Sequence, residues 1–99
     1  MIEQWTRDVF AQYVHTPFQV HPAGRPPVSL ELVELTDAAS APETESFSLH
    51  FRGPTSAFLG QGMFRFKHEQ MGAADLFIVP IGRDQAGYYY EAVFNRLRG

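Results

Sequence analysis

The chain has no cysteine, no long apolar run and no excess of basic residues. Without cysteine it can form no disulfide, no thiolate nucleophile and no cysteine-ligated zinc site. No segment approaches the roughly 20 apolar residues of a membrane-spanning helix, and the first residues lack the basic and apolar regions of a signal peptide. The formal net charge of −3 offers little attraction to nucleic acid. We therefore expect a cytoplasmic protein that binds neither membranes nor nucleic acid.

Aromatic residues, by contrast, are abundant: the 99 residues include nine Phe and four Tyr, and 44% of the chain is hydrophobic. This is enough apolar surface for one folded domain over residues 1–99 without disulfide or metal support. In three segments the apolar residues occupy every second position, which is the side-chain period of a strand and predicts a mainly β protein. These residues are Phe47, Leu49 and Phe51, then Phe64 and Phe66, and finally Tyr88, Tyr90, Ala92 and Phe94.

Helical spacing is found at the beginning of the chain, in the residues Trp5, Val9, Phe10, Tyr13 and Val14. It predicts a short helix over about 6–15, with Thr6 as the N-cap, that packs across one end of a sheet because it is too short to be stable alone. Strands are predicted over about 17–21, 28–36, 45–52, 62–68, 75–81 and 88–96. The small polar residues of 37–44 predict a loop. The fold class is a small antiparallel, partly closed barrel or sandwich of about six strands.

Local patterns refine the strands. Within 28–36 the apolar positions change phase after Leu32, which predicts a β-bulge. The segment 75–81 is apolar on both faces, which is typical of a strand covered on two sides. Pro80 has no N–H to donate, so we expect strand pairing to fail there. The turn that follows predicts a hairpin between this strand and 88–96.

The string from His68 to Gly72 comes nearest to an active-site motif. A zinc-peptidase helix needs a second histidine four residues after the first, and Gly72 holds that position, so a strand end followed by a turn explains the string better. The chain has no nucleophile elbow, no Ser-x-x-Lys pair and no glycine-rich phosphate loop. We therefore predict no metal, no cofactor and no enzymatic activity. A hydrolase that uses His50, His68 and nearby carboxylates is a third hypothesis.

Polar positions on the strands predict an interaction surface. His50 and Arg52 share the outward face of one strand, and Arg65 and Lys67 share that of the next strand along the chain. If the two strands are neighbours, these residues form a basic patch that suits an acidic protein surface or a phosphate. A charged edge that prevents sheet-to-sheet aggregation explains the same residues. Tyr89 is expected to point outward and to serve as an interface anchor.

Four motifs occur together in an order and spacing that resembles a known family. They are FSLHFRGP from Phe47, QGMFRFKHEQMG from Gln61, LFIVPIG from Leu76 and YEAVFNR from Tyr90. The chain resembles short bacterial proteins that are defined only as a domain of unknown function. The resemblance covers nearly the whole chain and implies a standalone bacterial domain, some of whose relatives are encoded near phage-tail-like proteins. It supplies no catalytic residues. Such relatives usually have glycine where this chain has His15, and a left-handed helix end costs somewhat more with histidine.

These observations favour a non-enzymatic protein-interaction or assembly module. Its expected partner is another protein or a second copy of the chain, which would be bound through the faces and edges of the sheet. The alternative is a β-barrel that binds a small ligand among its aromatic rings. About six strands leave little space inside once Phe and Tyr fill the interior, so the interaction module is the preferred hypothesis.

Overall fold

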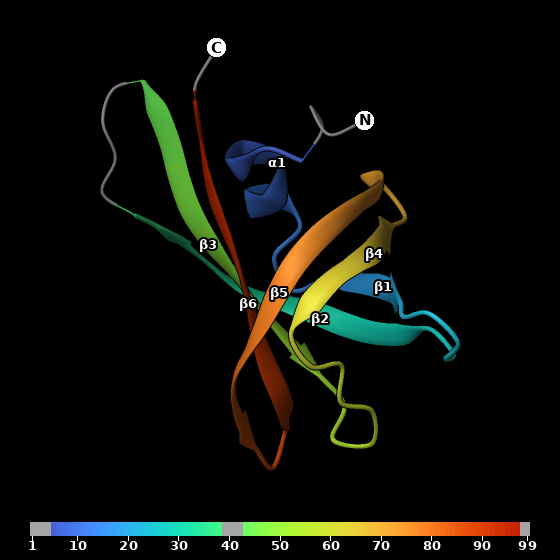
Figure 1. The fold of residues 1–99 in the computed structure, drawn as a ribbon. Coiled ribbons are helices and arrows are strands. Elements are labelled where there is room, and N and C mark those ends of the chain that lie inside the picture. Colours follow the sequence, from blue (N-terminus) through green and yellow to red (C-terminus); the bar gives the residue numbers. More distant parts are fainter. Residues whose placement is uncertain (1–4, 39–42, 98–99) are drawn as a thin grey trace.

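The computed structural model describes residues 5–38 and 43–97, which form one short helix and six strands (Figure 1). The elements are α1 (Arg7–Gln12), β1 (Pro17–His21), β2 (Val28–Asp37), β3 (Thr44–Gly53), β4 (Gly62–His68), β5 (Gly72–Asp84) and β6 (Gly87–Leu97). Every strand pair is antiparallel. The predicted fold class, mainly β with a short N-terminal helix, is confirmed. Half of the loop expected over 37–44 lies outside the described residues.

The strands form a closed barrel in the order β1-β2-β3-β6-β5-β4. Closure depends on β1, whose residue Val20 pairs with Val28 of β2 on one side and with Phe66 of β4 on the other. The ring is therefore closed rather than partly closed. The predicted hairpin between β5 and β6 is confirmed by the pair Asp84↔Gly87, but this ladder extends only to Val79↔Glu91. Beyond that pair β5 and β6 diverge, and α1 lies at the end of the barrel where they separate (Figure 1).

Register shifts bend two of the strands. The predicted bulge in β2 is confirmed between Leu32 and Glu34. A second shift lies between Pro80 and Gly82. Pro80 is nevertheless paired with Tyr90, and β5 continues to pair with β6 as far as Asp84, so the expectation that pairing fails at Pro80 was wrong. The physical reason is that the ladder between β4 and β5 already ends at Ile78. Pro80 therefore lies beyond any neighbour on that side that would need its missing N–H.

The interior of the barrel is filled with aromatic rings. Phe18 lies at its centre, with ring centroids 5.5 Å from Phe51, 5.9 Å from Trp5 and 6.5 Å from Phe66. All four side chains are fully buried. The alternation of apolar residues seen in the sequence therefore directs one face of each strand inward, and the rings pack there among aliphatic side chains such as Leu30, Leu49 and Ile78.

The helix α1 closes the open end of the barrel. Thr6 is its N-cap, as predicted, and the side-chain oxygen accepts a hydrogen bond from the N–H of Val9 at 3.3 Å. Phe10, fully buried, packs against Phe47 and Phe94. The helix is shorter than the range 6–15 because a turn follows Gln12 and leads to His15, which has a left-handed φ of 72°.

The expectation that β5 is covered on both faces was wrong. Leu76 and Ile78 point into the core, but Phe77 and Ile81 are about half exposed, at 48% and 49%. The strand has the ordinary inward and outward alternation, and its outer positions simply carry apolar side chains. In the described part of the structure no element packs over them.

Candidate functional site

The four basic residues expected to form one patch lie in two separate places. β3, which carries His50 and Arg52, pairs with β2 and β6, whereas β4, which carries Arg65 and Lys67, pairs with β1 and β5. The strands are therefore not neighbours, and two strands separate them in either direction around the barrel. The condition for a basic patch is not met. The cause is the connection over residues 54–61, which crosses the barrel instead of making a hairpin.

Each basic side chain of β3 is matched by a carboxylate from an adjacent strand. His50 lies between Glu34 of β2 and Glu91 of β6, with nitrogen–oxygen distances of 3.4 and 3.1 Å. Arg52 donates to Glu31 of β2 at 2.6 Å. We call the outer surface of β2, β3 and β6 the charged face. Its charges are arranged in cross-strand pairs, so it offers no unmatched positive potential to a ligand.

Tyr89 lies on this charged face, as predicted, but it is half-buried and already engaged. Its hydroxyl donates a hydrogen bond to Asp84 at 2.9 Å. This bond, together with the backbone N–H groups of Ala86 and Gly87, lowers the pKa of the Asp84 carboxyl. Tyr89 therefore holds the β5–β6 turn, and its role as an interface anchor stays a prediction.

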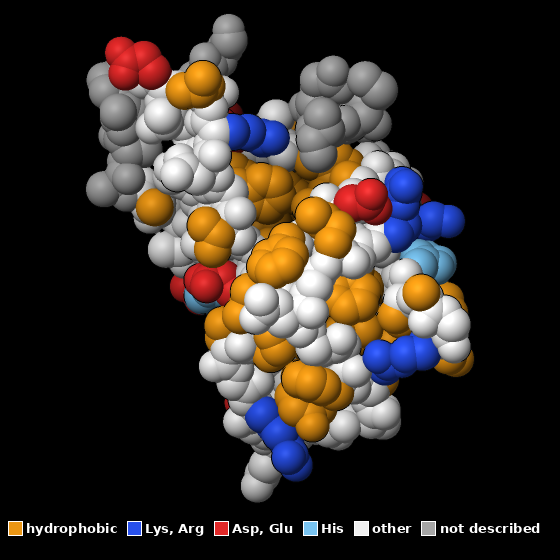
Figure 2. All heavy atoms as spheres, in the orientation of Figure 1, with side chains coloured by type: hydrophobic (Ala, Val, Ile, Leu, Met, Phe, Trp, Pro, Cys, Tyr) orange, Lys and Arg blue, Asp and Glu red, His pale blue; other side chains and the backbone are white. Residues whose placement is uncertain are grey.

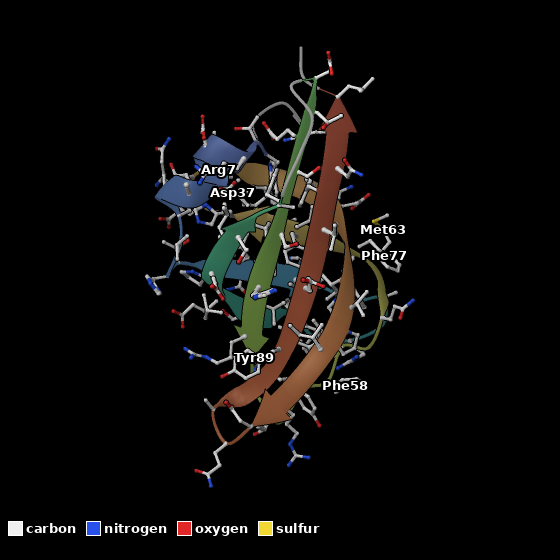
Figure 3. The ribbon with its side chains drawn as sticks, turned by 90° about the vertical axis from the view of Figure 1, so that its left-hand side faces the viewer. Arg7, Asp37, Phe58, Met63, Phe77 and Tyr89 are labelled. Atoms are coloured by element: carbon white, nitrogen blue, oxygen red, sulfur yellow. The ribbon has the colours of Figure 1, made fainter. Side chains whose placement is uncertain are left out.

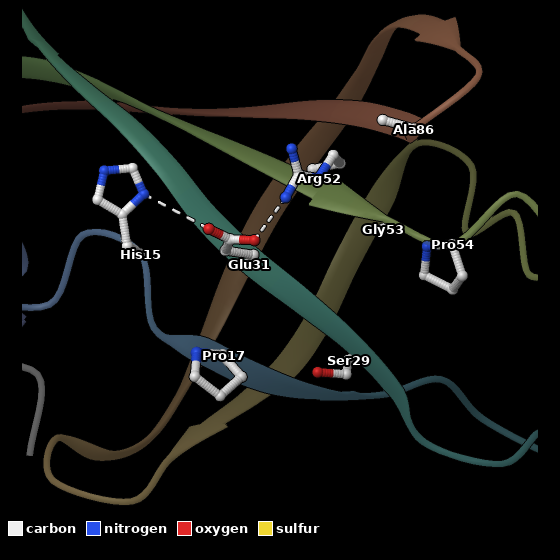
Figure 4. Close-up of a pocket in the computed structure, with 8 residues that line it drawn as sticks. All are labelled: His15, Pro17, Ser29, Glu31, Arg52, Gly53, Pro54 and Ala86. Carbon is white, nitrogen blue, oxygen red and sulfur yellow. Dashed lines mark hydrogen bonds and ion pairs between the residues drawn. The ribbon is translucent and has the colours of Figure 1, made fainter.

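A shallow hollow of about 330 Å³ lies beside the charged face, between β1, β2 and the end of β3 (Figure 4). Glu31 is its central charged group, because one carboxylate oxygen accepts from Arg52 and the other lies 3.4 Å from Nδ1 of His15. The remaining lining, which includes Pro17, Pro54 and backbone at Gly53, is small and neutral. Arg52 and Glu31, the charged groups that a ligand in this hollow would meet, are thus already paired with each other.

A second hollow, of about 370 Å³, lies at the end of β4 and includes His68, Lys67 and Tyr13. His68 is buried, and its Nδ1 accepts the backbone N–H groups of Gln70 at 3.0 Å and Met71 at 3.2 Å. Because Nδ1 is an acceptor twice over, the ring proton resides on Nε2, which lies 2.9 Å from the hydroxyl oxygen of Thr16. This geometry requires neutral histidine.

The surroundings of His68 agree with that protonation state. Its ring lies 4.4 Å from the ring of Phe18 and 4.7 Å from that of Tyr13. Burial lowers the pKa of His68 below its ordinary value, and the nearby carboxylate of Glu69 opposes this effect only in part. The string is a strand end followed by a turn, as predicted, and His68 also joins this β4–β5 turn to the segment after α1. Within residues 5–38 and 43–97 no three His, Asp or Glu side chains converge as metal ligands.

The surface that the sequence interpretation missed is apolar and lies on β4 and β5. Met63 and Phe77 are cross-strand partners, and both point outward, with 63% and 48% of their surfaces exposed. Phe58, in the connection before β4, and Ile81 of β5 are about half exposed. Hydrophobic side chains form a band down this face in Figure 2, and Figure 3 shows Phe58, Met63 and Phe77 on the same side of the molecule. We call Phe58, Met63, Phe77 and Ile81 the apolar patch.

A signal for this patch was present in the sequence. Residues 75–81 are apolar at both inward and outward positions, and in the structure the outward ones, Phe77 and Ile81, are about half exposed. The described residues contain no helix long and apolar enough to span a membrane.

Arg65 and Asp75, which are cross-strand partners 3.1 Å apart, lie on the same outer face as the patch and give it a neutral polar border.

Together the fold and these surfaces define a small six-stranded β-barrel domain with a helix across one end. Residues 5–94 match the family described as Domain of unknown function (DUF6916), so the chain belongs to that family. Searches of curated proteins and of solved structures found no match.

Proposed function

We propose that this protein is a non-enzymatic interaction module that binds a protein partner through the apolar patch. The observation that carries the proposal is the exposed cross-strand pair of Met63 and Phe77 on an outer barrel face. Exposed apolar side chains that lie side by side on a small domain are typical of interaction sites, and Met and Phe are enriched in such interfaces.

The geometry also indicates how a partner is bound. β4 pairs with β5 over its whole length and with β1 over Arg65–Lys67, so most of its backbone hydrogen-bonding groups are already used within the barrel. Recognition therefore depends on side chains: a partner inserts apolar groups against Met63 and Phe77, and its polar groups meet the Arg65–Asp75 pair at the border. The partner class is a folded protein with an exposed apolar anchor.

The biological setting belongs to the same proposal. An assembly role in a bacterial cytoplasm agrees with the absence of cysteine and with a resemblance to proteins encoded near phage-tail-like genes. Surface-mediated assembly needs no catalytic group, and Arg52, Glu31 and His68, which line the two hollows, are engaged in the structural contacts Arg52–Glu31 and His68–Thr16.

The test is a comparative capture experiment with three versions of the chain. Wild type, the double variant Met63→Lys/Phe77→Lys and the control Gln12→Lys/Gln85→Lys are immobilised, and retained proteins are identified by mass spectrometry. The control adds the same charge at exposed positions away from the patch. We expect a protein that wild type and control retain and the patch variant loses. Calorimetry with that purified protein should show binding weakened at least about tenfold, or about 1.4 kcal/mol. Equal retention by all three versions would remove the proposal.

Small-ligand binding is the second candidate, and one observation favours it. The hollow beside His68 combines the ring of Tyr13 with Lys67, which has no ion-pair partner among the described residues. An aromatic carboxylate suits this combination. Thermal-shift measurements with benzoate and indole-3-acetate would detect it, and a Lys67→Met variant that responds identically would argue against it.

A further inference from the structure

The edge of β6 that faces away from β3 carries no strand partner over residues 92–97 in the described structure. On its other side β6 pairs with β3 without interruption from Tyr88 to Leu97. Its pairing with β5 ends at Glu91, and the two strands diverge beyond it (Figures 1 and 3). Alternate residues of an antiparallel strand direct N–H and C=O groups to opposite sides. The segment 92–97 therefore presents backbone donors and acceptors along a free edge.

This free edge lacks the usual features that prevent strand addition. Natural edges are protected by proline, by bulges or by charged side chains. The segment 92–97 has no proline or glycine, and its register with β3 contains no shift. Its single charge, on Arg96, is directed to the backbone oxygen of Trp5 and to Glu45, at 2.8 and 3.3 Å.

The outer face of the same segment is uncharged and largely exposed. Val93 and Leu97 are 67% and 79% exposed, and Asn95 lies between them. The hydroxyl of Ser46 donates to Oδ1 of Asn95 at 2.9 Å, which leaves the two amide hydrogens of Asn95 available. An added strand therefore meets apolar side chains on both sides of a central amide.

We propose that a second copy of this chain adds its own β6 to this edge, antiparallel and centred on Asn95. A twofold axis at Asn95 places Val93 opposite Leu97 of the second copy, and each Asn95 opposite its equivalent. This pairing is self-complementary, because no like charges oppose one another on the outer face. It also uses only the free part of β6, since the ladder with β5 begins at Glu91.

This proposal concerns a different surface from the apolar patch. Its expected product is a continuous sheet in which β2, β3 and β6 of each copy are joined through the two β6 strands. The helix α1 contacts the inner face of this sheet through Phe10 and Phe94, so it leaves the edge free to pair.

Cysteine cross-linking tests the register directly, because the natural chain has no cysteine. A disulfide needs Cα atoms about 4.4–6.8 Å apart. Under mild oxidation Asn95→Cys should form a covalent species of twice the 11.2 kDa chain mass. The double variant Val93→Cys/Leu97→Cys should also cross-link. The single variants Val93→Cys and Leu97→Cys should cross-link far less, because each places its cysteine opposite a residue that is not cysteine. Met63→Cys, at a comparably exposed position, serves as the control and should stay monomeric.

Sedimentation equilibrium supplies an independent measurement. Wild type should show a concentration-dependent dimer, Val93→Lys should weaken it at least about tenfold by placing charge in the new sheet, and Met63→Lys should leave it unchanged. Circular dichroism confirms that the variants fold, since both positions are exposed. Wild type that is monomeric at all concentrations, or a dimer weakened by Met63→Lys and not by Val93→Lys, would overturn the proposal. Partner capture by the apolar patch would be unaffected by either result.

Discussion

The two sides of the barrel differ in the outward side chains that they carry. On the charged face, the charged side chains of β2, β3 and β6 form matched cross-strand pairs such as Glu31–Arg52 and His50–Glu91, and exposed apolar side chains are found only towards the end of β6, at Val93 and Leu97, among the described residues of these strands. On β4 and β5 the equivalent outward position is filled by Met63 opposite Phe77, and both remain exposed. The two surfaces enclose the same aromatic core.

This difference separates residues that complete the fold from residues that remain available. An arginine or histidine that already interacts with a carboxylate of the same chain can bind an anionic ligand only if the ligand displaces that carboxylate. An exposed Met–Phe pair gains most of its burial energy only when another molecule covers it. A basic side chain on a strand is therefore a poor indicator of a binding site until its neighbours are known.

The largest expected effect on stability is at Gly87, where the backbones of β6 and β3 approach each other closely. A Cβ at Gly87 would collide with the backbone oxygen of Gly53, and the φ of Gly87 is 156°. Gly87→Ala should therefore lower the free energy of unfolding by about 3 kcal/mol, measured by urea denaturation. Gly82→Ala is the matched control, because nothing lies within 4 Å of its added Cβ. Equal effects of the two variants would contradict the assigned close contact.

The pH dependence of stability is expected to be next in size. Burial lowers the pKa of His68 in the folded protein, so near pH 6.5 the unfolded chain takes up the proton more readily. The free energy of unfolding should then decrease as pH falls below about 6.5, by at most about 1.4 kcal/mol per pH unit, and level off below the folded pKa. Urea titrations between about pH 5 and 7 check this. His68→Gln should lack that component; an unchanged profile would assign it elsewhere.

Removing one partner of an ion pair should have a smaller effect, and it should differ between the two faces. Arg52→Met leaves Glu31 with only His15 nearby, at a half-exposed site. Arg65→Met frees Asp75, at a more exposed site. We expect the urea midpoint to fall more for Arg52→Met, and the difference between the variants to shrink in high salt. A reversed order would show that the charged face is not the more integrated of the two.

The smallest effect on stability is expected at the apolar patch. Met63→Ser/Phe77→Ser should change the free energy of unfolding by only about 0.5 kcal/mol, because a cross-strand pair contributes little when both members are exposed. The same variant should lose partner binding. A large loss of stability would mean that these side chains complete the core, and the contrast between the faces would disappear.

The inner face of the fold was predictable from the sequence, whereas the outer face was not. Alternation at Phe47, Leu49 and Phe51 depends only on local backbone geometry, and the phase change after Leu32 correctly indicated a bulge. Whether an outward residue is paired or available for binding depends on which strand lies beside it. Arg65 looked similar to Arg52 in sequence, but the connection over 54–61 put β4 on the far side of the barrel.

The left-handed turn at His15 shows a similar limit. The φ of His15 is 72°, a left-handed conformation that glycine adopts at lower cost than histidine. What the sequence did not reveal is that the following Thr16 joins Tyr13 and His68, with hydroxyl distances of 2.6 and 2.9 Å. Such links between distant segments depend on packing that local spacing does not record.

The way Trp5 is held makes the protein its own spectroscopic probe. It is the single tryptophan of the chain, fully buried, and its indole N–H donates to the backbone oxygen of Met71 at 3.0 Å. Because indole emission shifts to longer wavelength in water, the fluorescence maximum reports whether the helical end has separated from the β4–β5 turn. Far-ultraviolet circular dichroism reports the sheet as a whole, so the two signals together distinguish local opening from global unfolding.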